Sequence, residues 1–225
     1  MSFIHRLRPV TIAGAMLAGS AAVFAEVASM DPADSRSWDF EVFLNDKPIG
    51  YHRFLVRPEA DGYTLQTEAE FEVTFLFFTA YRYRHENVER WRGGCLESIE
   101  ARTDDNGQAL EVTGSRGMEG FSLAGQEADG VIDADCVRTF AYWDRSALED
   151  TRLLNSQTGE YQAVELRPMG REMIEIGGQA VPAQRYALSG EGLALDLWYS
   201  PEGDWLKLTS TVDNGRQLRY ELVQS

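Results

Sequence analysis

The sequence is short of the residues from which metal sites and many catalytic sites are built. Its 225 residues include 3 histidines and 2 cysteines. A zinc site generally needs three or four His, Cys or carboxylate ligands at recognisable spacing, and no such spacing occurs. The sequence also lacks a Gly-x-Ser-x-Gly nucleophile elbow and a glycine-rich phosphate loop ahead of a helix. We therefore expect no metal ion and no cofactor.

Basic residues are scarce relative to acidic ones. There are 21 Lys and Arg against 36 Asp and Glu, which gives a formal net charge of −15. A chain this acidic repels phosphate backbones, so nucleic acid is not an expected partner.

Long apolar runs are absent beyond the N-terminus. Arg6 and Arg8 precede an uncharged run over 9–25 that ends in Val23-Phe24-Ala25, the pattern of a signal peptide cleaved after Ala25. The less favoured alternative is an uncleaved anchor, because the run is short for a membrane span. We expect 1–25 to be a signal peptide. The mature protein is then periplasmic, in a Gram-negative bacterium, with no transmembrane span.

The two cysteines, Cys95 and Cys136, remain in the processed chain. In an oxidising compartment they can form one disulfide, which contributes about 3–4 kcal/mol to stability. Two buried free thiols are an equally open alternative.

Helix signals are also rare. One helical turn is predicted over 144–150, with Asp144 as its cap. Most of the remaining chain is typical of about a dozen short strands separated by turn residues. We expect an all-β fold, either a single antiparallel β-barrel or a strongly curled open sheet with little helix. Residues 26–37 are expected to be a loose leader, and 38–225 a single β-domain.

Three consecutive strands are predicted near the C-terminus, between Gly192 and Val223. Alternation places Leu206 and Leu208 on one face of the middle strand. A three-residue loop over 213–215 then pairs Leu208 with Tyr220, whereas a two-residue loop would pair it with a glutamate. Because a one-residue slip turns a whole strand over, we expect the three-residue loop.

The densest aromatic cluster lies between residues 71 and 81. These side chains either line the protein core, which we favour, or line an apolar cavity suited to an acyl chain in a curled sheet. The candidate ligand-binding residues are Phe71, Val73, Phe75, Phe77, Tyr81, Arg82, Tyr83, Arg84, Trp91 and Trp198.

Arg82 and Arg84 alternate with the two tyrosines of that set. They would suit a carboxylate or phosphate head group. Salt bridges to acidic residues on a neighbouring strand are the favoured alternative, and the candidates are Glu68, Glu70 and Glu72.

His85 is a weak catalytic candidate on the face of the two tyrosines. With a carboxylate partner it would act as a general base. We favour a strand histidine paired with a cross-strand carboxylate, since one histidine without an orienting group does not define a site.

Several segments carry a family resemblance. They are Tyr81-Arg82-Tyr83 through Glu89-Arg90-Trp91, Gly94-Cys95-Leu96, residues 103–107, and Asp196-Leu197-Trp198-Tyr199 with the following Pro-Glu-Gly. In these the chain resembles exported bacterial proteins of domain of unknown function 6134. The turn Asn45-Asp46-Lys47-Pro48-Ile49-Gly50 is similar to one in the broader unknown-function group 3108. The resemblance implies a signal peptide and an all-β fold, and supplies no catalytic residues.

Three functions stay open. The first is a non-enzymatic carrier for an apolar or lipid-like ligand, with a pocket lined by the 71–81 cluster and by Leu195, Leu197 and Leu208. The second is an envelope hydrolase or isomerase that uses His85 with a carboxylate. The third is an envelope assembly or structural factor that docks through sheet edges or through residues 76–78.

Overall fold

The structure, a computed structural model, describes residues 35–75, 78–125, 128–212 and 215–224. Within these ranges the chain forms one sheet of 14 strands whose neighbours all pair antiparallel, as the all-β prediction requires. The strands are β1 (Arg36–Leu44), β2 (Lys47–Glu59), β3 (Gly62–Phe75), β4 (Phe78–Arg92), β5 (Cys95–Asp105), β6 (Gln108–Gly117), β7 (Gly120–Gly125), β8 (Gly130–Ile132), β9 (Arg152–Leu154), β10 (Tyr161–Ile176), β11 (Gln179–Gly190), β12 (Leu193–Tyr199), β13 (Trp205–Val212) and β14 (Arg216–Gln224). The predicted signal peptide lies outside the described residues.

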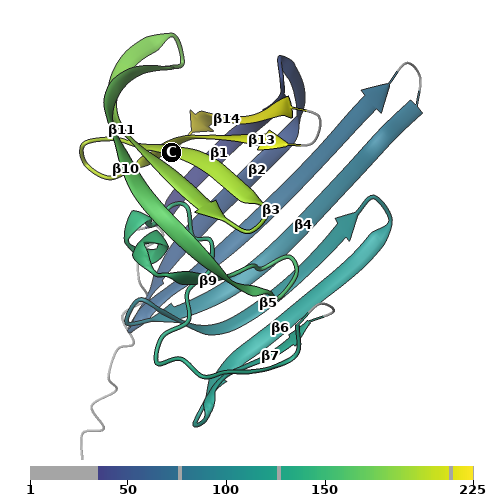
Figure 1. The fold of residues 1–225 in the computed structure, drawn as a ribbon, viewed down its shortest axis with the longest axis vertical. Coiled ribbons are helices and arrows are strands. Elements are labelled where there is room, and N and C mark those ends of the chain that lie inside the picture. The colour runs from purple at the N-terminus through teal and green to yellow at the C-terminus, as the bar shows by residue number, and fades with distance from the viewer. Residues whose placement is uncertain (1–34, 76–77, 126–127, 213–214, 225) are drawn as a thin grey trace, which may run out of the picture.

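The sheet is curled but not closed. Its strand order runs from β8 through β1, then from β14 through β9, so β8 and β9 are its two edges. The first and last strands, β1 and β14, therefore pair in the middle of the sheet. Figure 1 shows the long strands β3 and β4 on one side and the β10–β11 hairpin curling over them. Of the two predicted architectures, the strongly curled open sheet is correct.

The segment 133–151 connects the two edge strands and is packed into the fold. Its Val137, Ala141 and Trp143 are buried members of the main hydrophobic core. The predicted helical turn is present as a 3-10 helix, η2 (Arg145–Glu149). Asp144 caps it, because the Asp144 carboxylate accepts the backbone N–H of Ser146. We call 133–151 the connector.

The Cys95–Cys136 disulfide is formed and ties the connector to β5. The two Cα atoms lie 5.1 Å apart, and the bond closes a sequence separation of 41 residues. Beside it, the backbone N–H of Leu96 donates to the carbonyl of Val137. The disulfide thus fixes the point where the connector enters the concave side of the sheet.

Trp205 is the centre of the aromatic core. Its ring centroid lies 4.3 Å from that of Phe40, 5.1 Å from Phe54 and 5.5 Å from Tyr142 of the connector.

The register predicted for the three-residue loop between β13 and β14 is confirmed, since Leu208 pairs with Tyr220. The prediction that Leu206 and Leu208 share one face is wrong. A bulge in the pairing of β12 with β13 turns Trp205 toward the main core. Leu206 instead packs against a small separate cluster around Trp198.

The predicted leader, 26–37, extends too far. Strand β1 begins at Arg36, which pairs with Val56 of β2. Pairing needs only the backbone, so a polar Arg36 continues the strand where the apolar alternation has stopped. Its guanidinium also lies over the Trp38 ring, 4.8 Å from the ring centroid.

Candidate ligand-binding cavity

A cavity of about 760 Å³ lies in the concave side of the sheet. Small-molecule sites usually occupy about 300–1,000 Å³. The half-buried apolar side chains of its lining lie close to the turns at one end of the strands, and we call them the mouth. They are Leu44, Ile49, Phe71, Val73, Tyr81, Leu193, Val212 and Leu218.

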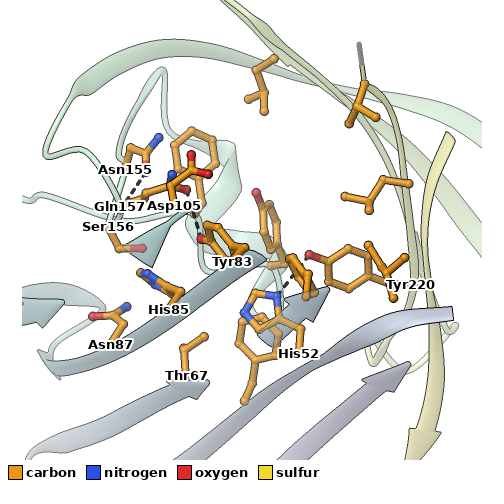
Figure 2. A pocket seen from close by; sticks show the side chains of 18 of the residues that line it. His52, Thr67, Tyr83, His85, Asn87, Asp105, Asn155, Ser156, Gln157 and Tyr220 are labelled. Atoms are coloured by element: carbon orange, nitrogen blue, oxygen red, sulfur yellow. Dashed lines mark hydrogen bonds between the residues drawn. The ribbon is translucent and has the colours of Figure 1, made fainter. Parts of the chain in front are cut away.

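The other end of the cavity is lined by the buried apolar Phe54 and Leu65 and by a group of polar side chains, which we call the floor. It consists of His52 on β2, Thr67 on β3, and His85, Asn87 and Glu89 on β4. Strand pairing brings these residues together, because Ala69 pairs with His52 on one side and with His85 on the other. Alternating residues share one face, so His85, Asn87 and Glu89 all point inward. Figure 2 shows His52, Thr67, His85 and Asn87 on neighbouring strands of the cavity lining.

The two floor histidines hydrogen-bond to hydroxyl groups. His52 Nδ1 lies 3.3 Å from the Tyr220 hydroxyl, and His85 Nδ1 lies 2.9 Å from Thr103 Oγ1. Burial lowers the pKa of His85 to about 4 and lowers the pKa of His52 well below its usual value. Both imidazoles are therefore neutral at pH 7.

Glu89 joins the floor to the connector. Its Oε1 accepts from Asn87 Nδ2 at 2.7 Å, and its Oε2 accepts from Trp91 Nε1 at 2.8 Å and Thr139 Oγ1 at 3.0 Å. Burial raises the pKa of Glu89, while these three hydrogen bonds act in the opposite direction. One buried carboxyl group thus holds three donors from two parts of the chain.

One wall of the cavity comes from the segment after β9. Asn155, Ser156 and Gln157 line it, and the Tyr83 hydroxyl donates to Gln157 Oε1 at 3.1 Å. Figure 2 shows this segment facing Tyr83 and Asp105. These wall residues lie in a polar turn with no periodic pattern, so the sequence held no signal for them.

The predicted site residues separate into two groups. Phe71, Val73, Tyr81, Tyr83 and His85 line the cavity. The ring of Phe71 stacks on that of Tyr83, with centroids 5.2 Å apart. Phe75 ends β3 but its side chain is not among those described, and Phe77 lies outside the described residues.

The two arginines do not line the cavity. Arg82 Nη2 lies 3.1 Å from Glu72 Oε2, and Arg84 Nη2 lies 2.9 Å from Glu70 Oε1. All four side chains are on the outer face of the sheet, where the alternation of β3 and β4 places them. The salt-bridge interpretation is correct for these pairs. Glu68 instead accepts a hydrogen bond from the Tyr51 hydroxyl.

Trp91, Trp198 and the three leucines also lie away from the cavity. Trp91 is buried in the main core, as are Leu197 and Leu208, and Leu195 packs against that core. Trp198 belongs to the small cluster with Ile174 and Ala183, and its indole N–H donates to Glu172 Oε1. These side chains stabilise the sheet around the cavity.

His85 is buried and its cross-strand partner is Thr103, so the favoured prediction of a strand histidine paired with a cross-strand carboxylate is wrong. Within the described residues, the carboxylate partner of the enzyme hypothesis is also not among the hydrogen-bond partners of His85. Its Nδ1 pairs with a threonine hydroxyl, whereas a general base is usually oriented by a carboxylate.

No group of three or more His, Cys, Asp or Glu residues suited to a metal ion occurs in the part of the chain that the structure describes. In that same part, no helix is long and apolar enough to cross a membrane.

His85 should make stability depend on pH. The pKa of histidine is about 6.5 in an unfolded chain, whereas burial lowers it to about 4 in the folded protein. Between these values the unfolded state binds more protons, so the free energy of unfolding falls as the pH falls. At pH 4 the titration of His85 should have lowered the free energy of unfolding by about 3 kcal/mol.

Denaturant unfolding of the wild type and of His85→Gln from pH 7 to pH 4 measures this effect. The variant should lose less stability than the wild type over this interval, and comparing the two cancels the titration of Glu89. The titration of His52 changes in part with the variant, because His85 helps to lower the pKa of His52. Parallel stability curves would contradict the assignment.

Comparison with known proteins supports the fold. The chain is similar to the crystal structure of a beta-barrel-like protein of domain of unknown function DUF1849 from Brucella abortus. The likeness covers 84% of this chain and 95% of that one, with a TM-score of 0.59 and 10% sequence identity. At this identity it concerns the fold alone. No curated protein matches the chain. Residues 40–223 match the family model of DUF6134, a domain of unknown function, and the chain therefore belongs to the DUF6134 family.

Proposed function

We propose that this protein is an exported, non-enzymatic carrier that binds an apolar or lipid-like ligand in the concave side of its curled sheet. The observation that carries the proposal is the cavity of about 760 Å³ beside a closely packed aromatic core. A core of native density leaves few voids larger than a water molecule, so a space of this size next to it is a feature of the fold.

The mouth supports an apolar ligand. Leu44 and Leu218 pair across the β1–β14 junction and both line the cavity. Ile49, Val73 and Leu193 add aliphatic surface around them, and all of these side chains remain half-buried. A bound hydrocarbon chain would remove this surface from water, which contributes about 25 cal/mol per Å².

Two features support export to an oxidising compartment. One is the signal-like N-terminus, and the other is the Cys95–Cys136 disulfide. Structural disulfides persist in secreted and periplasmic proteins and are rare in the cytosol. The proposed carrier therefore works in the periplasm.

Native mass spectrometry of the protein purified from its own cell envelope tests the proposal. Copurification of a lipid-like molecule in the folded protein is the expected result. A protein that carries no ligand and binds no apolar probe would refute a carrier role.

A single substitution at the mouth should block the cavity. Leu193 lines it at the start of β12, while its neighbour Ala194 is exposed on the opposite face. We expect Leu193→Trp to weaken binding of the uncharged dye N-phenylnaphthylamine by about 10-fold or more, because the indole occupies the space of the probe. Ala194→Trp is the matched control and should bind within about 2-fold of the wild type. Equal weakening by both variants would place the dye outside the cavity.

A further inference from the structure

Strand β10 has one edge that is mostly unpaired. Strand β9 pairs with it only from Tyr161 to Ala163, and the backbone N–H of Val164 then donates to the carbonyl of Thr151. From residue 165 onward, β10 pairs with β11 alone within the part of the chain that the structure describes. Most side chains of this stretch are exposed, and Figure 1 shows the β10–β11 hairpin at the periphery of the molecule. An open edge of this kind can accept another strand.

The register identifies the backbone groups that point to the open edge. Along a strand, the N–H and C=O groups of successive residues point to opposite edges. The N–H of Val164 points away from β11, and the register shifts by one residue at the bulge after Pro168. Beyond the bulge, the groups that point to the open edge belong to Arg171, Met173 and Glu175.

Prolines block the neighbouring edges of this hairpin but not residues 171–176. Pro168 removes an N–H from the open edge of β10 before the bulge. Pro182 removes one from the far edge of β11, beyond Gln184, where the pairing with β12 ends. Pro182 lies opposite Met173, which agrees with the assignment because neither residue bonds across the ladder. The stretch 171–176 therefore keeps a complete set of outward donors and acceptors.

The side chains of this stretch carry opposite charges on either side of its centre. Arg171 and Glu175 each lie two residues from Met173, and all three side chains are exposed, Met173 by 61%. Neither charged side chain forms an ion pair among the described residues. On the other face, Ile174 packs in the small cluster around Trp198, which holds the stretch in place.

We propose that two copies of this chain associate by antiparallel pairing of residues 171–175 across a two-fold axis at Met173. Met173 then lies opposite its equivalent in the second copy, and Arg171 of each copy lies opposite Glu175 of the other. The outward residues exchange backbone hydrogen bonds, and the two charge pairs lie on one face of the joined sheet.

Charge selects this register over its neighbours. Pairing centred on Arg171, Glu172 or Glu175 places each of these side chains opposite its own equivalent, and like charges in that position destabilise a sheet. Pairing centred on Ile174 leaves Arg171 and Glu175 without opposite charges across the interface. The register centred on Met173 alone matches both charges.

Sedimentation equilibrium of the disulfide-bonded protein at about 0.15 M salt, which screens the net negative charge, tests the proposal. The wild type should shift from monomer toward dimer as its concentration rises to roughly 0.5 mM, because so short an interface binds weakly. Arg171→Glu and Glu175→Arg each place like charges opposite one another twice in the dimer, and each should weaken association by about 10-fold or more. The double variant with both changes restores the two pairs and should associate within about 3-fold of the wild type.

Two further variants separate the edge from general effects. Glu119→Arg alters an exposed residue in the turn between β6 and β7, changes the net charge as Glu175→Arg does, and should associate as the wild type does. Met173→Pro removes the central outward N–H but leaves the β10–β11 ladder intact, so the variant should fold and stay monomeric.

Three results would overturn the proposal. The first is a wild type that stays monomeric at every concentration, even if this edge then accepts an extended peptide from another protein. The second is a dimer that both single charge reversals leave unchanged, which would place the interface elsewhere. The third is a double variant that associates no better than the single ones. The charge variants decide the matter even if Met173→Pro does not fold.

Discussion

Replacement of Glu89 by alanine should destabilise the protein by about 3–5 kcal/mol. The change leaves the Asn87 amide, the Trp91 indole and the Thr139 hydroxyl without their acceptor. Each buried donor left unpaired costs about 1–3 kcal/mol, and water entering from the adjacent cavity limits the total. Chemical unfolding at pH 7 measures the loss.

Two other variants define the cause of this loss. Glu89→Gln keeps an acceptor oxygen in place and should lose less stability than Glu89→Ala. Glu86→Ala alters the exposed outer face of the same strand and should change stability by less than about 0.5 kcal/mol. If Glu89→Ala and Glu86→Ala had equal stability, the buried carboxyl group would not be the anchor that its contacts indicate.

Removal of the disulfide should lower the free energy of unfolding by about as much as the Glu89→Ala substitution does. For a loop of this length the chain-entropy relation gives about 4 kcal/mol, and the bonded cysteines are separated by 41 residues. The double variant Cys95→Ala with Cys136→Ala should therefore unfold at a lower denaturant concentration than the oxidised wild type. The slope of the transition reports whether the unfolded state has also changed.

Reductant supplies the control for this second prediction. Wild-type protein unfolded in the presence of dithiothreitol should match the double variant, and dithiothreitol should not affect the variant. If the oxidised wild type were no more stable than the variant, strain elsewhere in the folded state would have cancelled the benefit of the bond.

The local features of this fold could be predicted from its sequence because the sheet has one apolar and one polar face. Along β3, Leu65, Thr67 and Phe71 alternate with the polar Gln66, Glu68 and Glu70, and the first three line the cavity. The pairing of Leu208 with Tyr220 followed from the same logic, since the competing register would have exposed one of them.

Bulges and long-range contacts could not be predicted in this way. The inward turn of Trp205 depends on a local irregularity opposite Tyr199, which alternation alone does not indicate. The connector was recognised only as a helical turn near Asp144. Its buried Val137 and Ala141 do alternate along the chain, and this was a usable signal that the connector belonged to the core.

The candidate site could be predicted only in part, for the same reason. Periodicity placed Tyr83 and His85 on a common face of their strand, but the cavity they line is completed by Gln157 and Tyr220 from distant parts of the chain. No local pattern links these segments, because the strand order of the sheet brings them together.

The pairing of β1 with β14 has a consequence for how the molecule is made. As the chain emerges, β1 is complete long before β14, and until then one of its edges has no neighbour. An unpaired edge beside Phe40 and Val42 is a template for association between chains. The nascent protein must therefore be kept apart from other copies until its final strand arrives, and shortening the C-terminal strand would make that exposure permanent.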